Sequence, residues 1–186
     1  MSRLRNQTVL LSSLSLLCCL WPAVNGGLTV AQTFAIPADI AQELKRELVE
    51  ISEFRECPNF RDNFQLTKLD LNQDNRPEFI VHGLRQCLCS PTGNCSFWIY
   101  QRTPKGPKLL LSTHGVQRFK FKKSRSKGFL DLVTSMHDSA TSSEVSLYRF
   151  NGEVYEIFKV WAEEYEYPDS EGNMKIWKRP RIVPCD

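Results

Sequence analysis

The sequence predicts a mainly β fold, an antiparallel meander of blade-like hairpins with one amphipathic helix near the N-terminus. From residue 64 onward, short runs rich in β-branched and aromatic residues recur between Gly, Pro, Asn and Ser, which is the pattern of strands joined by turns. Before these runs, one stretch repeats apolar residues at steps of three and four. That spacing is typical of a helix that buries one face.

The first 26 residues are predicted to be a secretory signal peptide. Arg3 and Arg5 precede an apolar run from Val9 to Leu20, which is shorter than the ~20 residues that span a bilayer. Small residues around Gly26 suit cleavage there. We therefore expect residues 27–186 to be a single secreted or periplasmic domain without a membrane span, because about 160 residues suit one hydrophobic core.

Residues 37–54 carry the helical pattern. Pro37 suits the first turn of a helix, where its missing N–H is not needed. We expect the apolar stripe to pack on the domain's own sheet. The residues of this stripe are Ile40, Leu44, Leu48, Ile51 and Phe54.

The strand pattern divides into two units of about four strands each, at residues 64–112 and 116–160. Their sequences resemble each other at an offset of about 50 residues. This similarity fits either a degenerate two-unit repeat or the chance similarity between the strands of any β-meander. Between two runs of the second unit, Asn151-Gly152 predicts a type I′ hairpin turn. The proline-containing segment 165–186 is expected to be an irregular tail.

Five of the seven cysteines lie outside the signal peptide, so an oxidising compartment would leave one of them unpaired. We prefer a disulfide between Cys89 and Cys95 across the intervening turn, and a second one between Cys57 and either Cys185 or Cys87. A zinc site is the alternative, but the paired C-x2-C and histidine spacing of structural zinc sites is missing.

A short acidic loop is the strongest candidate for a metal site. Calcium prefers six to eight oxygen ligands, and oxygen-bearing groups alternate along this loop just before an apolar strand. The candidate ligands are the side chains of Asp70, Asn72, Asp74 and Glu78, together with the main-chain carbonyl of Arg76. The alternative is an Asx-type turn in which the same side chains cap backbone amides.

The loop resembles the calcium loop of FG-GAP and VCBS repeats, whose pattern is approximately D-x-N-x-D-G-x-x-D/E followed by an apolar strand. The resemblance implies a β fold, a structural Ca²⁺ and an extracellular or periplasmic interaction role. Asn75 stands where that pattern has glycine, a tolerable change because Asn enters the left-handed region readily. The second unit keeps only Gly128 and Asp131, so its equivalent metal site is expected to be lost.

A basic stretch follows, because no acidic residue lies between Phe79 and Leu130. At the strand period of two, Phe119 and Phe121 face one side of this stretch and the cations face the other. Such a row suits an anionic polymer or an acidic protein, whereas nucleic acid suits an exported domain poorly. The alternative is a solvated strand face. The candidate binding residues are Arg118, Lys120, Lys122 and Lys123.

No catalytic residues are predicted. The three histidines are not in H-E-x-x-H, and the chain has neither a G-x-S-x-G elbow nor a phosphate-binding loop. The sequence therefore favours a non-enzymatic interaction module. Its alternatives are a secreted inhibitor of an enzyme such as a lysozyme and, less favoured, a hydrolase that acts on envelope material.

Overall fold

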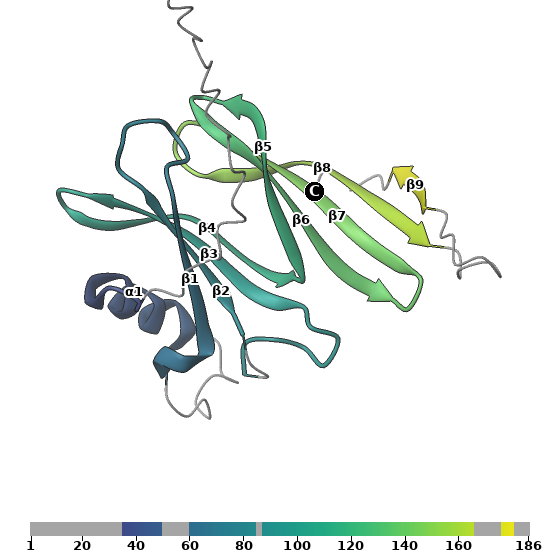
Figure 1. Ribbon diagram of the computed structural model, residues 1–186, viewed down its shortest axis with the longest axis horizontal. Coiled ribbons are helices and arrows are strands. Elements are labelled where there is room, and N and C mark those ends of the chain that lie inside the picture. The colour runs from purple at the N-terminus through teal and green to yellow at the C-terminus, as the bar shows by residue number, and fades with distance from the viewer. Residues whose placement is uncertain (1–34, 50–59, 85–86, 166–175, 181–186) are drawn as a thin grey trace, which may run out of the picture. The chain divides into compact units, whose positions relative to one another are not determined.

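The computed structural model describes residues 35–49, 60–84, 87–165 and 176–180 (Figure 1). The chain divides into two units, Met1–Val30 and Ala31–Asp186, and every described residue belongs to the second. The predicted signal peptide therefore lies outside the described residues, as do Ile51 and Phe54 of the predicted helical stripe. Within the described ranges, no helix is long and apolar enough to cross a membrane.

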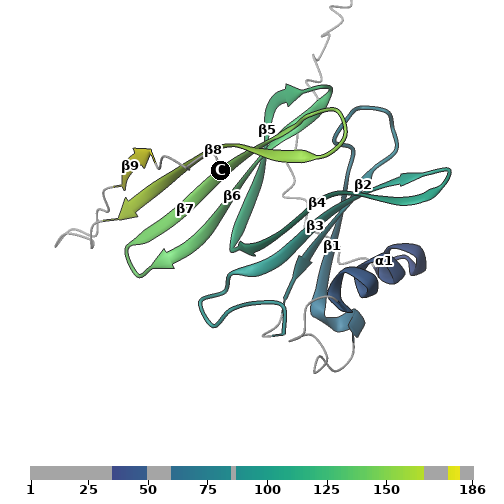
Figure 2. The same cartoon turned by 180° about the vertical axis from the view of Figure 1, so that it is seen from behind.

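The fold is mainly β, as predicted, and consists of two antiparallel sheets (Figure 1, Figure 2). The first sheet has the order β1-β2-β3-β4 and the second has the order β5-β6-β7-β8-β9, so within each sheet every strand pairs with its neighbours in the sequence. The strands are β1 Phe64–Leu69, β2 Glu78–Gly83, β3 Cys95–Thr103, β4 Gly106–Val116, β5 Arg118–Ser126, β6 Phe129–Ser139, β7 Ser142–Phe150, β8 Tyr155–Tyr165 and β9 Ile176–Pro180.

The helix α1, Ala38–Val49, begins directly after Pro37 and covers one face of the first sheet, while a short 3₁₀ turn, Phe60–Asn63, leads into β1 (Figure 1). The buried stripe of α1, which includes Ile40, Leu44 and Leu48, packs in one cluster with Leu66 and Trp98 of the sheet. Burying each of these large side chains contributes about 1.5–3 kcal/mol, so the stripe explains why this segment is helical and where it docks.

A second apolar cluster joins the two sheets. It contains Ile80, Phe97 and Leu110 from the first sheet, and Leu132 and Tyr148 from the second. In β2, Val81 belongs to the cluster under α1, whereas its neighbour Ile80 belongs to the inter-sheet cluster. Burial on both faces explains why β2 is a continuous apolar run instead of an alternating one.

Two local expectations differ from the structure. The predicted irregular tail contains β9, which pairs with the C-terminal half of β8. The predicted type I′ turn at Asn151-Gly152 is wrong, because β8 begins only at Tyr155 and Asn151 does not have a positive φ. Instead, the Asn151 side chain accepts hydrogen bonds from the N–H groups of Glu153 and Val154, at 2.8 and 2.9 Å.

Candidate functional site

The acidic loop connects β1 to β2 and is closed by its own side chains. The carboxylate of Asp70 accepts hydrogen bonds from the backbone N–H groups of Gln73, Asn75 and Asp74, at 2.7, 2.9 and 3.3 Å. Gln73 and Asn75 adopt left-handed φ angles of 66° and 63°, a region that asparagine enters more readily than most residues. Partial desolvation of the Asp70 carboxyl is outweighed by these hydrogen bonds, which lower its pKa.

The remaining loop side chains bond in the same way. Asn72 Oδ1 accepts the N–H of Asp74 at 3.1 Å, and Asp74 Oδ1 accepts the N–H of Arg76 at 2.8 Å. In addition, Asn72 Nδ2 donates to Asp74 Oδ2 at 3.1 Å. The three predicted ligand side chains at positions 70, 72 and 74 therefore form the Asx-type turn that was the alternative to a calcium site.

The calcium assignment stays a prediction. A carboxylate offers about four lone pairs, so Asp70 with three bonds and Asp74 with two retain acceptor capacity, and their oxygens are the hard ligands that calcium prefers. Among the described residues, no group of three or more His, Cys, Asp or Glu side chains is placed to hold a metal ion.

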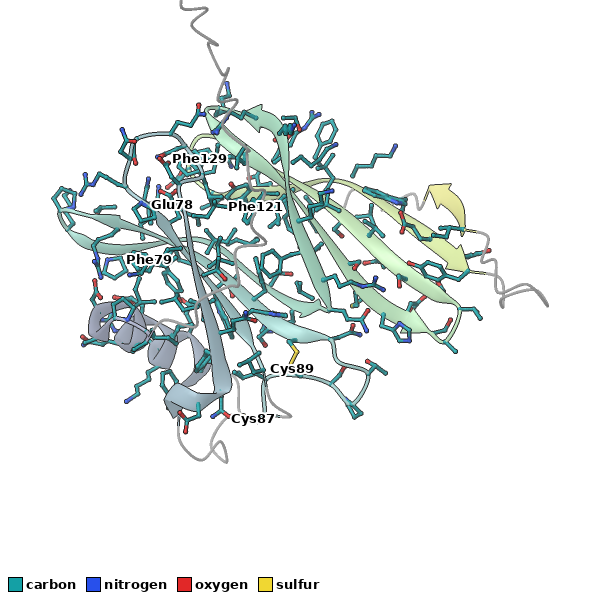
Figure 3. The ribbon with its side chains drawn as sticks, in the orientation of Figure 1. Glu78, Phe79, Cys87, Cys89, Phe121 and Phe129 are labelled. Atoms are coloured by element: carbon teal, nitrogen blue, oxygen red, sulfur yellow. A yellow bond between two sulfur atoms is a disulfide. The ribbon has the colours of Figure 1, made fainter. Side chains whose placement is uncertain are left out.

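Glu78, the last predicted ligand, lies at the start of β2 (Figure 3). Its side chain is almost completely buried, with 1% of its surface exposed. Its carboxylate accepts the N–H of Leu71 at 2.8 Å and Nε2 of Gln101 at 3.3 Å. Burial raises the pKa of the Glu78 carboxyl, and these two hydrogen bonds offset only part of that effect. Glu78 therefore stabilises the acidic loop through its buried hydrogen bond with the N–H of Leu71.

Leu71 links the acidic loop to the second sheet. Its side chain is fully buried, and its carbonyl oxygen accepts two hydrogen bonds, from the N–H of Leu130 at 2.9 Å and from Arg125 Nη1 at 2.7 Å. The same guanidinium nitrogen donates to the carbonyl of Gly128 at 2.7 Å. The acidic loop and the end of the basic stretch, which the sequence presented as separate features, are thus in direct contact.

A bulge interrupts β5 between Phe121 and Arg125. Phe121 pairs with Leu132 and Arg125 pairs with Leu130, so three residues of β5 lie opposite Asp131 alone. Asp131 is 3% exposed, and its carboxylate accepts hydrogen bonds from Ser124 Oγ at 2.7 Å and Ser126 Oγ at 2.6 Å. Sequence reasoning missed this cluster. Its only signal in the sequence was a pair of serines two positions apart, Ser124 and Ser126, shortly before Asp131.

Tyr155 completes the polar junction between the acidic loop and the β5–β6 hairpin. Its hydroxyl donates to the carbonyl of Leu130 at 2.8 Å. Burial raises the pKa of the Tyr155 hydroxyl, and the negative charges of Glu78 and Asp131 raise it further. The two buried carboxylates therefore lie close enough to the same phenol to act on it electrostatically.

From Arg118 to Phe121, the predicted cation-binding face of β5 is arranged as the strand period requires, whereas Lys122 and Lys123 lie in the bulge. Phe119 and Phe121 are partly buried and pack against the inter-sheet cluster, with the ring of Phe119 4.8 Å from that of Phe97. The four predicted binding residues are exposed, and within the described part of the chain none of them has a carboxylate within 4.0 Å. We call these residues, Arg118, Lys120, Lys122 and Lys123, the cationic row.

The Cys89–Cys95 disulfide forms as preferred, which contradicts the zinc alternative for these two residues (Figure 3). Cys87 is disulfide-bonded as well, whereas Cys57 and Cys185 lie outside the described residues. Within the disulfide loop, Asn94 makes two 2.7 Å hydrogen bonds to the backbone of His137, one through Nδ2 and one through Oδ1. This link between the two sheets was also missed, since nothing in the local sequence indicates it.

One serine–histidine pair is present on the first sheet. Ser96 Oγ lies 2.9 Å from His114 Nδ1, across the β3–β4 pair. Among the described residues, no carboxylate is hydrogen-bonded to His114, so the orienting acid of a catalytic triad is missing from this arrangement. The pair is a cross-strand contact that sequence reasoning did not anticipate.

Comparison with family models, with curated proteins and with solved structures gives no match to this chain.

Proposed function

We propose that this protein is an exported, non-enzymatic interaction module that binds an anionic partner through the cationic row. The observation that carries the proposal is the set of four exposed cations on one edge strand, none within 4.0 Å of a carboxylate of the described residues. Positive charges on alternate strand residues lie about 7 Å apart, so they repel one another and attract anions. An anionic partner would relieve that repulsion.

The row is held on a rigid support. Phe119 and Phe121 anchor β5 in the inter-sheet cluster, and Arg125 ties its far end to Leu71. Because the strand is fixed at both ends, the cations lose little further backbone freedom when a partner binds, which favours affinity. The Cys89–Cys95 disulfide supports export, since such bonds persist in oxidising compartments.

The acidic loop has a supporting role in this proposal. A Ca²⁺ held by Asp70, Asn72 and Asp74 would be structural and would stiffen the entry to β2. Through the Leu71 carbonyl, the same loop supports the β5–β6 hairpin that carries the cationic row. The metal would therefore act on binding only indirectly.

Lysines on edge strands also discourage edge-to-edge aggregation, which is the competing explanation of the row. The two explanations differ in how the protein responds to a polyanion. We would measure binding of the purified chain to immobilised heparin, as a sulfated polyanion, and to soluble polyglutamate. The variants are the double charge reversal Lys120→Glu with Lys122→Glu, and the control Lys105→Glu in the exposed β3–β4 turn.

The proposal predicts binding that weakens as salt rises above about 0.1 M, because exposed charges are screened within ~10 Å at that ionic strength. The double reversal should weaken binding by about tenfold, since each exposed contact is worth up to ~1 kcal/mol, and Lys105→Glu should not. Equal binding by the two variants would show that the cationic row is not the binding surface.

A further inference from the structure

We infer that the anionic partner is an extended acidic polypeptide that adds to the second sheet as a further strand beside β5. This inference rests on the proposed function and specifies its partner. β5 is the first strand in the order of its sheet, and its only strand partner among the described residues is β6. An edge strand directs half of its backbone N–H and C=O groups away from its neighbour, where another extended chain can pair with them.

The unbroken part of β5 determines how many residues can pair with an added strand. Residues Arg118–Phe121 form an uninterrupted ladder with Thr134, Val133 and their neighbours on β6, and the bulge begins directly after Phe121. An added strand would therefore pair with these four residues. Beyond them, Lys122 and Lys123 are both exposed at the bulge and would meet the next residues of the same partner.

The side chains of Arg118–Phe121 predict the sequence pattern of the partner strand. Arg118 and Lys120 are exposed on one face, whereas Phe119 and Phe121 on the other face are only partly buried. Residues opposite one another in an antiparallel pair share a face, and opposite charges or apolar pairs at such positions are stabilising. The partner should therefore alternate acidic residues, which meet the cations, with apolar residues, which cover the remaining surface of the two phenylalanines.

The other open strand edge of the same sheet lacks these features. β9 pairs with β8 only from Trp161 onward, so the first half of β8 has no described neighbour on that side. There, exposed Glu156 and Lys159 carry opposite charges, and the ladder with β7 shifts register around Phe158, over which the Arg149 guanidinium lies at 3.5 Å. This edge of β8 has mixed charge and an irregular register, so it favours no single kind of partner. We therefore place the added strand beside β5.

The test uses an eight-residue peptide of alternating Glu and Val and two N-methylated versions of it, one methylated at the Glu residues and one at the Val residues. Successive N–H groups of a strand point to opposite sides, so only one version blocks pairing with β5, and the other is its matched control. Binding to the full chain is measured together with hydrogen exchange at the backbone amides of Arg118–Phe121.

Strand addition predicts that one methylated version binds about tenfold more weakly than the other, because it loses two or more hydrogen bonds. It also predicts slower amide exchange within Arg118–Phe121 when the parent peptide is bound. If the three peptides bind equally, or heparin and polyglutamate bind as tightly as the parent peptide without slowing exchange, strand addition is wrong although the proposed function survives. If no anionic probe binds, both fail.

Discussion

Replacement of Arg125 tests whether the β5–β6 hairpin is held on the acidic loop as the hydrogen bonds indicate. In Arg125→Met, a side chain with a similar apolar stem remains but the guanidinium is lost. The native guanidinium donates to the carbonyls of Leu71 and Gly128, each at 2.7 Å. A hydrogen bond from a charged group contributes about 1.5–3 kcal/mol when its partner is shielded from water.

The two bonds should contribute unequally. Leu71 is fully buried, so its bond counts nearly in full, whereas Gly128 lies in an exposed turn where water can replace the donor. The Leu71 carbonyl also keeps the N–H of Leu130, so no acceptor is left without a partner. We therefore expect Arg125→Met to lower the free energy of unfolding by about 2 kcal/mol, and the melting temperature by roughly 4–8 °C.

Urea unfolding followed by circular dichroism measures this loss. The matched control is Arg118→Met on the same strand, where an exposed cation without an ion pair to the described residues is removed, and its effect should stay within about 0.5 kcal/mol. The reasoning is refuted if the two variants lose the same stability, or if Arg125→Met differs from wild type by less than about 0.5 kcal/mol.

Three further predictions concern buried or loop groups. Burial raises the pKa of Glu78 above its ordinary value of 4.5, so its contribution to stability is fully present below that value and is lost as pH rises through the raised pKa. The stability of wild type relative to Glu78→Gln should therefore fall as pH rises above 4.5, and a flat or rising difference contradicts this. Millimolar calcium should raise the melting temperature of wild type but not of Asp74→Ala, and no shift in either would reject the metal site. Tyr100 Oη is buried without a hydrogen-bond partner among the described residues, so Tyr100→Phe should raise the free energy of unfolding by about 1 kcal/mol, and a loss in urea unfolding would show that the hydroxyl is satisfied.

Local sequence patterns were sufficient for the outline of the fold. The step of three and four from Ile40 to Leu48 predicted α1 and its buried face, and the apolar runs predicted eight of the strands. The alternation around Phe119 predicted which side of β5 packs against the core. Each of these patterns is a period that one element imposes on its own residues, so no knowledge of the partner element is needed.

The arrangement of the candidate site depended on contacts between distant residues. Arg125 and Leu71 are separated by 54 positions, and Asn94 and His137 by 43. The register of β5 against β6 is interrupted by a bulge after Phe121, so the consecutive residues Lys122 and Lys123 are both exposed. A period-two prediction assumes an unbroken ladder, and it fails where three residues of β5 lie opposite one residue of β6.

Sequence alone thus predicted the β class, the helix and the position of the cations, and it favoured the Cys89–Cys95 pairing, because each depends on residues close together in the chain. Only the folded chain determined that β5 is an edge strand, that Glu78 and Asp131 are buried, and that the acidic loop contacts the basic hairpin through Leu71. These features result from how two sheets pack on a shared core, where burial and hydrogen-bond satisfaction select contacts that no local pattern encodes.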